Sequence, residues 1–272
     1  MESFKIGLCQ MQVDQSKELN LARAASAIQE AAQQGCQLVA LPEMFNCPYG
    51  NQYFSSYAET FPGGKTINRL SQMAKENSIY LVGGSIPEQE DGKFYNSSFI
   101  FSPTGDMLAR HRKVHLFDID IPDGITFKES DTLSPGHAAT SFTTPFGRVG
   151  VAICYDIRFP ELIRTMTLQG IVLLILPAAF TMVTGPAHWE LTMRARALDN
   201  QIYVAAISPA RDKSADFIAY GHSLVTSPWG EVIVQAAEQP SVLTATIDLK
   251  MLAQVRQQLP LLKHRQVKVY QA

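Results

Sequence analysis

Short apolar segments alternate with amphipathic segments along most of this chain. We expect strands where four to ten mainly apolar residues are bounded by polar or turn-forming ones, at residues 4–13, 38–41, 79–86, 171–176, 202–208, 221–227, 231–235 and 242–248. We expect helices where apolar side chains recur every three or four positions, at residues 19–34, 67–77, 158–169 and 188–200. This alternation predicts an α/β protein.

Two further pairs of segments have the pattern of β-hairpins. Residues 94–101 and 107–110 flank a Ser-Pro-Thr-Gly-Asp turn, and residues 141–145 and 148–153 flank a Phe-Gly turn. Hairpins mixed with helical crossovers indicate two mixed sheets packed face to face, with helices outside. Because no linker, repeat or low-complexity segment interrupts the pattern, we predict a single domain over residues 1–272.

The composition is that of a globular protein with a substantial core. Of the 272 residues, 46% are hydrophobic and 18% are charged, which argues against disorder. The net charge of −2 provides no basic excess that could neutralise phosphates. We therefore expect no nucleic-acid partner.

The sequence shows no segment that we interpret as a membrane span. The longest apolar run, residues 170–180, has about half the length that a span needs and contains Pro177. The first residues lack the apolar region of a signal peptide and are short and acidic for a transit peptide. We expect no membrane association and a cytoplasmic location, with a mitochondrial pool left open.

The cysteines and histidines do not have the spacing of a metal site. Four cysteines, at positions 9, 36, 47 and 154, include no Cys-x-x-Cys pair, and we interpret all four as reduced thiols. His111, His115 and His222 are spaced unlike metal ligands. We predict no metal and no organic cofactor.

The strongest chemical signal is Cys154, which stands where the apolar segment before it ends. Asp156, Pro160 and Glu161 then resemble the start of a helix, with an N-cap residue, a proline in the first turn and an acid. A thiol facing a helix N-terminus has a lowered pKa and is a better nucleophile. The alternative is an inert core cysteine.

Two other segments place a carboxylate and a cation beside apolar residues. Glu43 ends an apolar strand, and Lys113 lies between a basic run and an apolar patch. Each alone is typical of solvated surface charge. Together with Cys154, however, they supply a base, a cation and a nucleophile.

Three motifs occur in the order found in a known enzyme family. They are Leu41-Pro42-Glu43, residues 112–117 (RKVHLF) and residues 154–161 (CYDIRFPE). In these the chain resembles the nitrilase superfamily of carbon–nitrogen hydrolases, whose catalytic triad is Glu-Lys-Cys. The resemblance implies the nitrilase fold, a four-layer α-β-β-α sandwich of two mixed sheets with outer helices. It also implies a homodimer that pairs through helical layers.

Further motifs are similar to one branch, the Nit-type omega-amidases. These are residues 45–50, 83–88, 116–122, 184–191 and 195–201. This resemblance implies hydrolysis of the terminal amide of a small 2-oxo acid, 2-oxoglutaramate or 2-oxosuccinamate. Cys154 would form a thioester, Glu43 would act as the base, and Lys113 would stabilise the oxyanion together with the Tyr155 backbone N–H.

The same resemblance suggests a supporting carboxylate and candidates for substrate binding. Glu129 matches a second family glutamate and would position Lys113 and the amide, although by itself it is typical of a solvated loop. A substrate carboxylate requires a cation or clustered donors, for which Arg158 and Tyr49 are our candidates. A structural ion pair is an equal alternative for Arg158.

Apolar walls and one departure complete the predicted site. Phe45 and Phe180 would contact the methylene chain of the substrate. Thr181 stands where the branch typically has asparagine, so the substrate preference is less secure than the type of reaction.

Three alternatives stay open. A deaminated-glutathione amidase, from a sister Nit branch, has the same triad and a larger substrate. A true nitrilase is disfavoured because Tyr155 and Arg158 differ from the tryptophans of that branch. A non-catalytic interaction protein on the same fold is a third alternative, since a fold does not imply a function.

Overall fold

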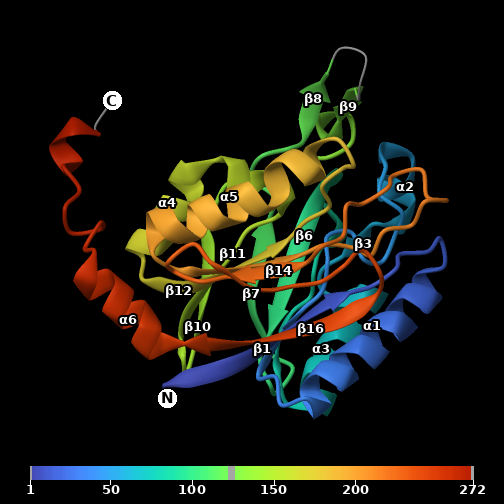
Figure 1. The fold of residues 1–272 in the computed structure, drawn as a ribbon. Coiled ribbons are helices and arrows are strands. Elements are labelled where there is room, and N and C mark those ends of the chain that lie inside the picture. Colours follow the sequence, from blue (N-terminus) through green and yellow to red (C-terminus); the bar gives the residue numbers. More distant parts are fainter. Residues whose placement is uncertain (1, 122–125, 271–272) are drawn as a thin grey trace.

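The computed structural model describes residues 2–121 and 126–270, in which two β-sheets lie face to face between layers of helices (Figure 1). Among these residues the first sheet has eight strands in the order β16-β1-β2-β4-β6-β5-β3, with β7 paired to β6. Its strands are β1 (Ser3–Gln10), β2 (Leu38–Ala40), β3 (Glu59–Thr60), β4 (Tyr80–Val82), β5 (Ile86–Glu90), β6 (Lys93–Phe101), β7 (Met107–Arg112) and β16 (Ser241–Asp248).

The second sheet has six strands in chain order within the described residues. They are β10 (Thr140–Thr144), β11 (Gly147–Val151), β12 (Ile171–Pro177), β13 (Tyr203–Ile207), β14 (Leu224–Thr226) and β15 (Val232–Gln235). A separate two-stranded ribbon, β8 (Asp118–Asp120) and β9 (Thr126–Lys128), projects from one end of the sandwich (Figure 1).

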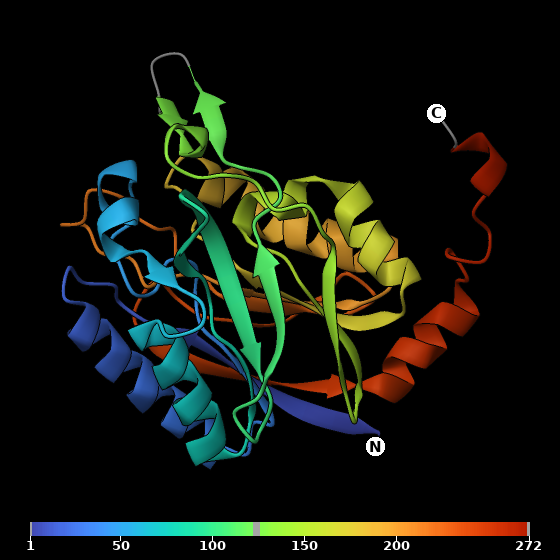
Figure 2. The ribbon, with the colours of Figure 1, turned by 180° about the vertical axis from the view of Figure 1, so that it is seen from behind.

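Helices cover the outer face of each sheet. The first sheet carries α1 (Lys17–Gln33) and α3 (Lys65–Asn77), and the second carries α4 (Pro160–Leu168) and α5 (Thr184–Asn200), as Figure 2 shows from behind. The short α2 (Asn51–Tyr57) lies near the ribbon end, and α6 (Leu249–Gln258) follows β16 at the opposite end. The four-layer α-β-β-α sandwich is therefore confirmed.

Successive side chains of a strand point to opposite faces of its sheet, so a strand that is covered on both faces is apolar at consecutive positions. On β12, Leu173 and Ile175 belong to the core between the sheets, whereas Leu174 and Leu176 pack under α4 and α5. All four side chains are fully buried. Continuous apolar runs in the sequence thus correspond to strands that are covered on both sides.

One predicted strand is divided in the structure. Residues 79–86 were expected to form one strand, but β4 ends at Val82 and β5 begins at Ile86. Gly84, with φ of +59°, lies so close to Pro42 that a Cβ would approach its carbonyl oxygen to 2.2 Å. The break therefore results from close contact with the segment that carries Glu43.

Other elements differ from the prediction at their ends or were missed. The helix expected at 188–200 begins earlier, at Thr184, and α2, β3, β8 and β9 were not predicted because they are short and lack clear periodicity. Of the helices in residues 2–121 and 126–270, none combines the length and the apolar character that crossing a bilayer requires.

Candidate active site

The ends of three strands bring Glu43, Lys113 and Cys154 together. Glu43 follows β2, Lys113 follows β7, and Cys154 follows β11 in the second sheet. All three are buried, with exposed fractions of 1%, 0% and 4%. The site therefore forms where the two sheets meet, although its residues are far apart in the sequence.

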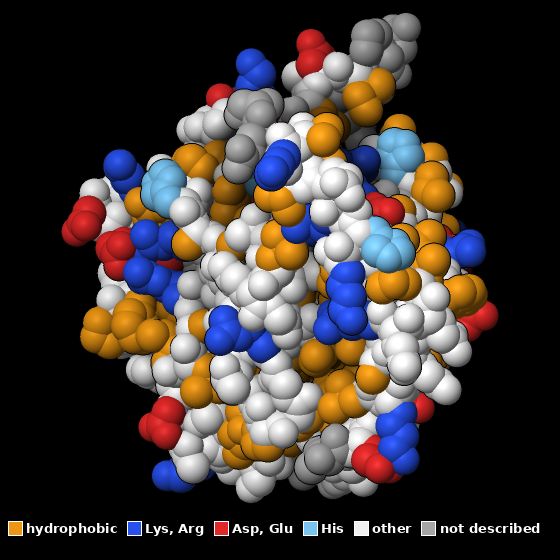
Figure 3. All heavy atoms as spheres, turned by 90° about the vertical axis from the view of Figure 1, so that its left-hand side faces the viewer, with side chains coloured by type: hydrophobic (Ala, Val, Ile, Leu, Met, Phe, Trp, Pro, Cys, Tyr) orange, Lys and Arg blue, Asp and Glu red, His pale blue; other side chains and the backbone are white. Residues whose placement is uncertain are grey.

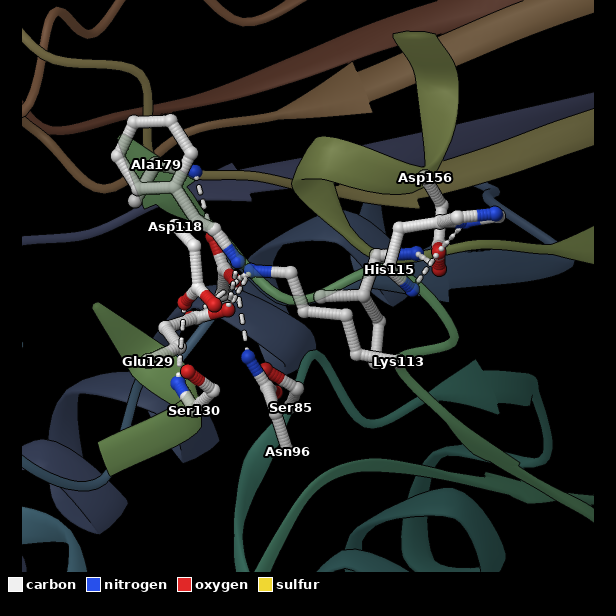
Figure 4. A network of polar contacts seen from close by, with 12 residues as sticks. Ser85, Asn96, Lys113, His115, Asp118, Glu129, Ser130, Asp156 and Ala179 are labelled. Atoms are coloured by element: carbon white, nitrogen blue, oxygen red, sulfur yellow. Dashed lines mark hydrogen bonds and ion pairs between the residues drawn. The ribbon is translucent and has the colours of Figure 1, made fainter. Parts of the chain in front are cut away.

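Lys113 lies between two carboxylates. Its Nζ is 3.1 Å from Glu43 Oε1 and 2.9 Å from Glu129 Oε1, and Figure 4 shows its side chain reaching toward Glu129. The Cys154 thiol is close enough to the Glu43 carboxylate for the two groups to influence each other's pKa. The structure thus places the predicted supporting carboxylate, Glu129, in direct contact with the predicted cation.

Glu43 is held by two donors that the sequence analysis did not identify. Asn96 Nδ2 in β6 donates to Oε1 at 2.9 Å, and the backbone N–H of Ala179, after β12, donates to Oε2 at 2.8 Å. Asn96 is completely buried. The signal that could have revealed it is a polar amide within a strand whose other face is apolar.

A strained turn directs the Glu43 side chain into the site. Met44, the next residue, has φ of +50°, in the left-handed region that non-glycine residues seldom adopt. The Ser85 hydroxyl accepts a hydrogen bond from the Met44 N–H at 3.1 Å and so satisfies the buried turn. Ser85 follows Gly84, whose close approach to Pro42 makes this contact possible.

Glu129 is anchored independently of the lysine. Its Oε2 accepts from the Phe117 backbone N–H at 2.7 Å, and its Oε1 accepts from the Tyr49 hydroxyl at 2.5 Å. The Tyr49 hydroxyl therefore donates its hydrogen bond to Glu129. The structure places Tyr49 beside this supporting carboxylate, with its ring along the cavity described below.

The electrostatics of the cluster favour a charged lysine and a carboxyl that readily holds a proton. Burial raises the pKa of Glu43 above its ordinary 4.5, and Glu129 adds to this effect, while Lys113 opposes it. Burial alone would lower the pKa of Lys113, but Glu129 and Glu43 outweigh it and raise that pKa above 10.5. Lys113 thus stays cationic.

The predicted lowering of the Cys154 pKa is wrong. Burial and the nearby Glu43 carboxylate raise the pKa of this thiol well above 9.0. The reason is local: Cys154 begins a 3₁₀ turn (Cys154–Arg158), and α4 starts only at Pro160, with Phe159 as its N-cap. The thiol is therefore protonated and needs a base.

The predicted N-cap role of Asp156 is also wrong. Its carboxylate lies within the 3₁₀ turn and accepts hydrogen bonds from the Ile153 backbone and from residues after Lys113. The sequence pattern of an acid before a proline resembled a helix start, but here it marks a contact between distant segments.

Two adjoining cavities open beside the cluster. The smaller is lined by Glu43, Ala179, Tyr49 and Phe217, among others, and the larger, of about 440 Å³, shares Tyr49 and Phe217. The larger cavity is mainly apolar, with aromatic lining from Phe117 and Phe127 as well. Among the described residues that line the two cavities there is no lysine or arginine.

The predicted substrate-binding residues are distributed unevenly around these cavities. Thr181 lines the larger cavity, but its hydroxyl accepts hydrogen bonds from the N–H groups of Val183 and Thr184 at the start of α5. Phe45 packs in the core beneath α1 and α3, and Phe180 packs beneath α5, so neither ring lines the two cavities.

Arg158 and Tyr155 lie beside the nucleophile turn. The Arg158 guanidinium is 5.0 Å from the centre of the Phe180 ring and 5.8 Å from that of the Tyr155 ring, and it contacts His188 Nδ1 at 3.2 Å. Both side chains are half-buried. Neither the predicted ligand role of Arg158 nor the oxyanion role of the Tyr155 N–H is tested by this geometry.

In the part of the chain that the structure describes, no three or more His, Cys, Asp or Glu side chains converge as metal ligands.

Comparison with known proteins adds a family and several relatives. The family model described as carbon-nitrogen hydrolase matches residues 5–257. The chain is 55% identical to Omega-amidase NIT2 of Xenopus tropicalis over 270 residues, covering 99% of this chain and 98% of that protein. It is 53% identical to Omega-amidase NIT2 of Homo sapiens over 270 residues, with the same coverage. The crystal structure of Saccharomyces cerevisiae Nit3, a member of branch 10 of the nitrilase superfamily, matches with a TM-score of 0.90 at 41% identity, covering 97% of both chains.

Proposed function

This chain belongs to the carbon–nitrogen hydrolase family, and we propose that its site hydrolyses the terminal amide of 2-oxoglutaramate or 2-oxosuccinamate to the 2-oxo dicarboxylic acid and ammonia. The protein is a hydrolase of linear amides, and its omega-amidase activity follows from its full-length similarity to Omega-amidase NIT2 proteins. The observation that carries the mechanism is the buried lysine between two carboxylates, with the Cys154 thiol near one of them, Glu43.

In the first half-reaction Cys154 attacks the amide carbonyl while Glu43 removes the thiol proton. Because the pKa values of both groups are raised by burial, the proton is transferred as the carbon–sulfur bond forms. The Lys113 ammonium balances the negative charge that develops on the carbonyl oxygen. Glu43 then gives the proton to the amide nitrogen, the carbon–nitrogen bond breaks, and ammonia leaves the thioester.

In the second half-reaction a water molecule cleaves the thioester. Glu43 accepts a proton from the water, the hydroxide attacks the carbonyl carbon, and the carbon–sulfur bond breaks. Glu43 returns the proton to the sulfur, which restores the protonated thiol. Asn96 and the Ala179 N–H keep Glu43 oriented through both steps, since each bonds one of its oxygens.

The distal carboxylate of the substrate needs a cation, and we assign this role to Arg158. No lysine or arginine, Arg158 included, is among the described residues that line the two cavities, so Arg158 would reach the carboxylate from the side of the nucleophile turn. Arg158 is half-buried, lies four residues after Cys154, and can form a bidentate pair with a carboxylate. Its contact with His188 leaves further N–H donors on the guanidinium.

A second candidate, the deaminated-glutathione amidase reaction, is favoured by one observation. The larger cavity has a volume of about 440 Å³, within the range of roughly 300–1,000 Å³ typical of pockets for drug-sized ligands. Its apolar lining by Phe117, Phe127 and Phe217 would suit the body of a tripeptide-sized acid.

Ammonia release from 2-oxoglutaramate and from deaminated glutathione, measured side by side with Cys154→Ala as the blank, tests both reactions. We expect turnover of the first that disappears in the variant. Preference for deaminated glutathione would replace the substrate and keep the nucleophile. Activity retained by Cys154→Ala would refute the mechanism, and a folded enzyme inactive on both would refute both substrates.

We also infer a homodimer and a cytoplasmic location. Three leucines on α4 and α5 are exposed, namely Leu168 (53%), Leu191 (67%) and Leu198 (42%), and a partner subunit could cover them. Figure 3 shows the side near α6, where hydrophobic side chains are mixed with lysine and arginine. Light scattering after size exclusion would show twice the mass of 30.1 kDa, and cell fractionation would test the location.

A further inference from the structure

Asp156 is a buried carboxylate to which the proposed reaction assigns no role. It lies two residues after Cys154 and is fully buried. Its carboxylate accepts hydrogen bonds from the backbone N–H groups of Val114, His115 and Ile153. Burial alone would raise its pKa, but hydrogen bonds from His111 and His115 hold the pKa below its ordinary 3.8. Asp156 is therefore an acceptor with a permanent negative charge.

The two oxygens of Asp156 bond to different segments. Oδ2 accepts from the backbone N–H of Ile153 at 3.0 Å, and Ile153 is the residue directly before Cys154. Oδ1 accepts from the backbone N–H of Val114 at 3.2 Å, and Val114 is the residue directly after Lys113. One side chain thus joins the immediate neighbours of the nucleophile and of the lysine.

Two histidines complete the arrangement. His111 Nε2 is 3.1 Å from Oδ2, and His115 Nδ1 is 2.8 Å from Oδ1. Because an ionised carboxylate only accepts, each imidazole donates an N–H to it. The His115 backbone N–H donates to Oδ1 as well, at 2.9 Å. Figure 4 shows His115 and Asp156 in contact on the side of Lys113 away from Glu129.

A series of aromatic contacts also links the segment after Lys113 to the segment after Cys154. The His115 ring stacks on Phe159 at a centroid distance of 3.6 Å, and Phe159 contacts Tyr155 at 5.4 Å. Tyr155 contacts Phe117 at 5.2 Å, and the Phe117 N–H bonds Glu129. The segments that carry the nucleophile and the lysine are thus joined on both sides.

We propose that Asp156 is a positioning residue that sets the Cys154 sulfur at the correct separation from the Lys113 ammonium for oxyanion stabilisation. The inference rests on the proposed roles of these two residues. Cys154 has φ of +45°, a conformation that surrounding contacts must maintain, and the Ile153–Asp156 hydrogen bond is directly adjacent to it. A displacement near 1 Å at such a site can cost about 100-fold in rate.

Asp156→Asn tests the proposal because it preserves the shape of the side chain. One carboxylate oxygen becomes an NH₂ group, which cannot accept a hydrogen bond from the backbone N–H groups that face it. Either the turn that carries Cys154 or the segment after Lys113 would then lose its hydrogen bond to residue 156. We expect kcat per reactive Cys154 to fall about 100-fold, with KM changed by less than about threefold. Reactive sites are counted by complete alkylation of Cys154 and peptide mass spectrometry, and Cys154→Ala provides the blank.

Glu88→Gln is a matched control. Glu88 is also fully buried and accepts hydrogen bonds from Ser97, Arg110 and Arg112. Arg112 directly precedes Lys113, but none of these partners flanks Cys154, so Glu88 does not join the two segments. We expect a lower melting temperature and an unchanged kcat per reactive site. Equal losses of kcat in both variants, or an unchanged kcat per site in Asp156→Asn, would overturn the proposal.

His115→Phe provides a test if Asp156→Asn does not fold. Phenylalanine keeps the stacking on Phe159 and removes only the Nδ1–H donor to Oδ1. We expect kcat per site to fall roughly tenfold, because one hydrogen bond to the charged group is lost. An unchanged value would overturn the proposal. Amide hydrolysis by Cys154→Ala at the wild-type rate would instead refute the proposed function itself.

Discussion

Two charge clusters are built partly on adjacent residues at the end of β7 in the first sheet, Arg112 and Lys113, and they differ in charge balance and in contact with water. Around Glu88, Arg110 and Arg112 pair with both Glu88 and Glu90, so two cations meet two anions. The side chains of Arg110 and Arg112 remain 28% and 17% exposed. This cluster joins β5 and β7, which both pair with β6.

The second cluster has one cation for two anions and no exposure. The side chains of Lys113, Glu43 and Glu129 are each 0% exposed. Burial raises the pKa of Glu43, Lys113 opposes this effect, and the neighbouring Glu129 carboxylate adds to it. A balanced cluster that reaches solvent stabilises strands, whereas an unbalanced dry cluster can accept and return a proton during a reaction.

Among the variants that test this comparison, Lys113→Met should have the largest effect on kcat. It removes the oxyanion donor, so we expect kcat to fall by roughly 100- to 1,000-fold. It also leaves two buried carboxylates unpaired, which should lower the free energy of unfolding by about 3–5 kcal/mol. Steady-state kinetics and urea unfolding measure both effects. A kcat within about tenfold of wild type would show that Lys113 is structural.

Glu129→Gln should have an intermediate effect and shift the pH profile. Activity needs Glu43 as a carboxylate, so the acid limb of kcat/KM should lie above pH 4.5 in the wild type. Removing the Glu129 charge lowers the pKa of Glu43, so the limb should move to lower pH while kcat falls about tenfold. A limb that stays in place or moves to higher pH would contradict the coupling of the two carboxylates.

Glu88→Gln should have the smallest effect on turnover, although its effect on stability should be large. Breaking the buried pair should lower the free energy of unfolding by about 3–5 kcal/mol. We expect kcat per reactive site within about threefold of wild type and an acid limb at the wild-type pH. Loss of turnover on the scale of Lys113→Met would show that the two clusters act as one unit.

Much of the layered fold could be predicted from local patterns. The apolar run at 171–176 and the periodic residues of 19–34 are close to β12 and α1, because a covered strand and an amphipathic helix have distinct periods. The break at Gly84 could not be predicted, because it depends on the approach of Pro42 from a distant segment.

For the site, the sequence by itself determined which residues could supply a base, a cation and a nucleophile. Glu43, Lys113 and Cys154 were identifiable because charged or reactive side chains follow apolar strands and match family motifs. The tertiary structure alone decided their states. Asn96 reaches Glu43, Tyr49 bonds Glu129, and the Cys154 pKa is raised instead of lowered. Burial and charge depend on neighbours that are distant in the chain, and local sequence does not specify them.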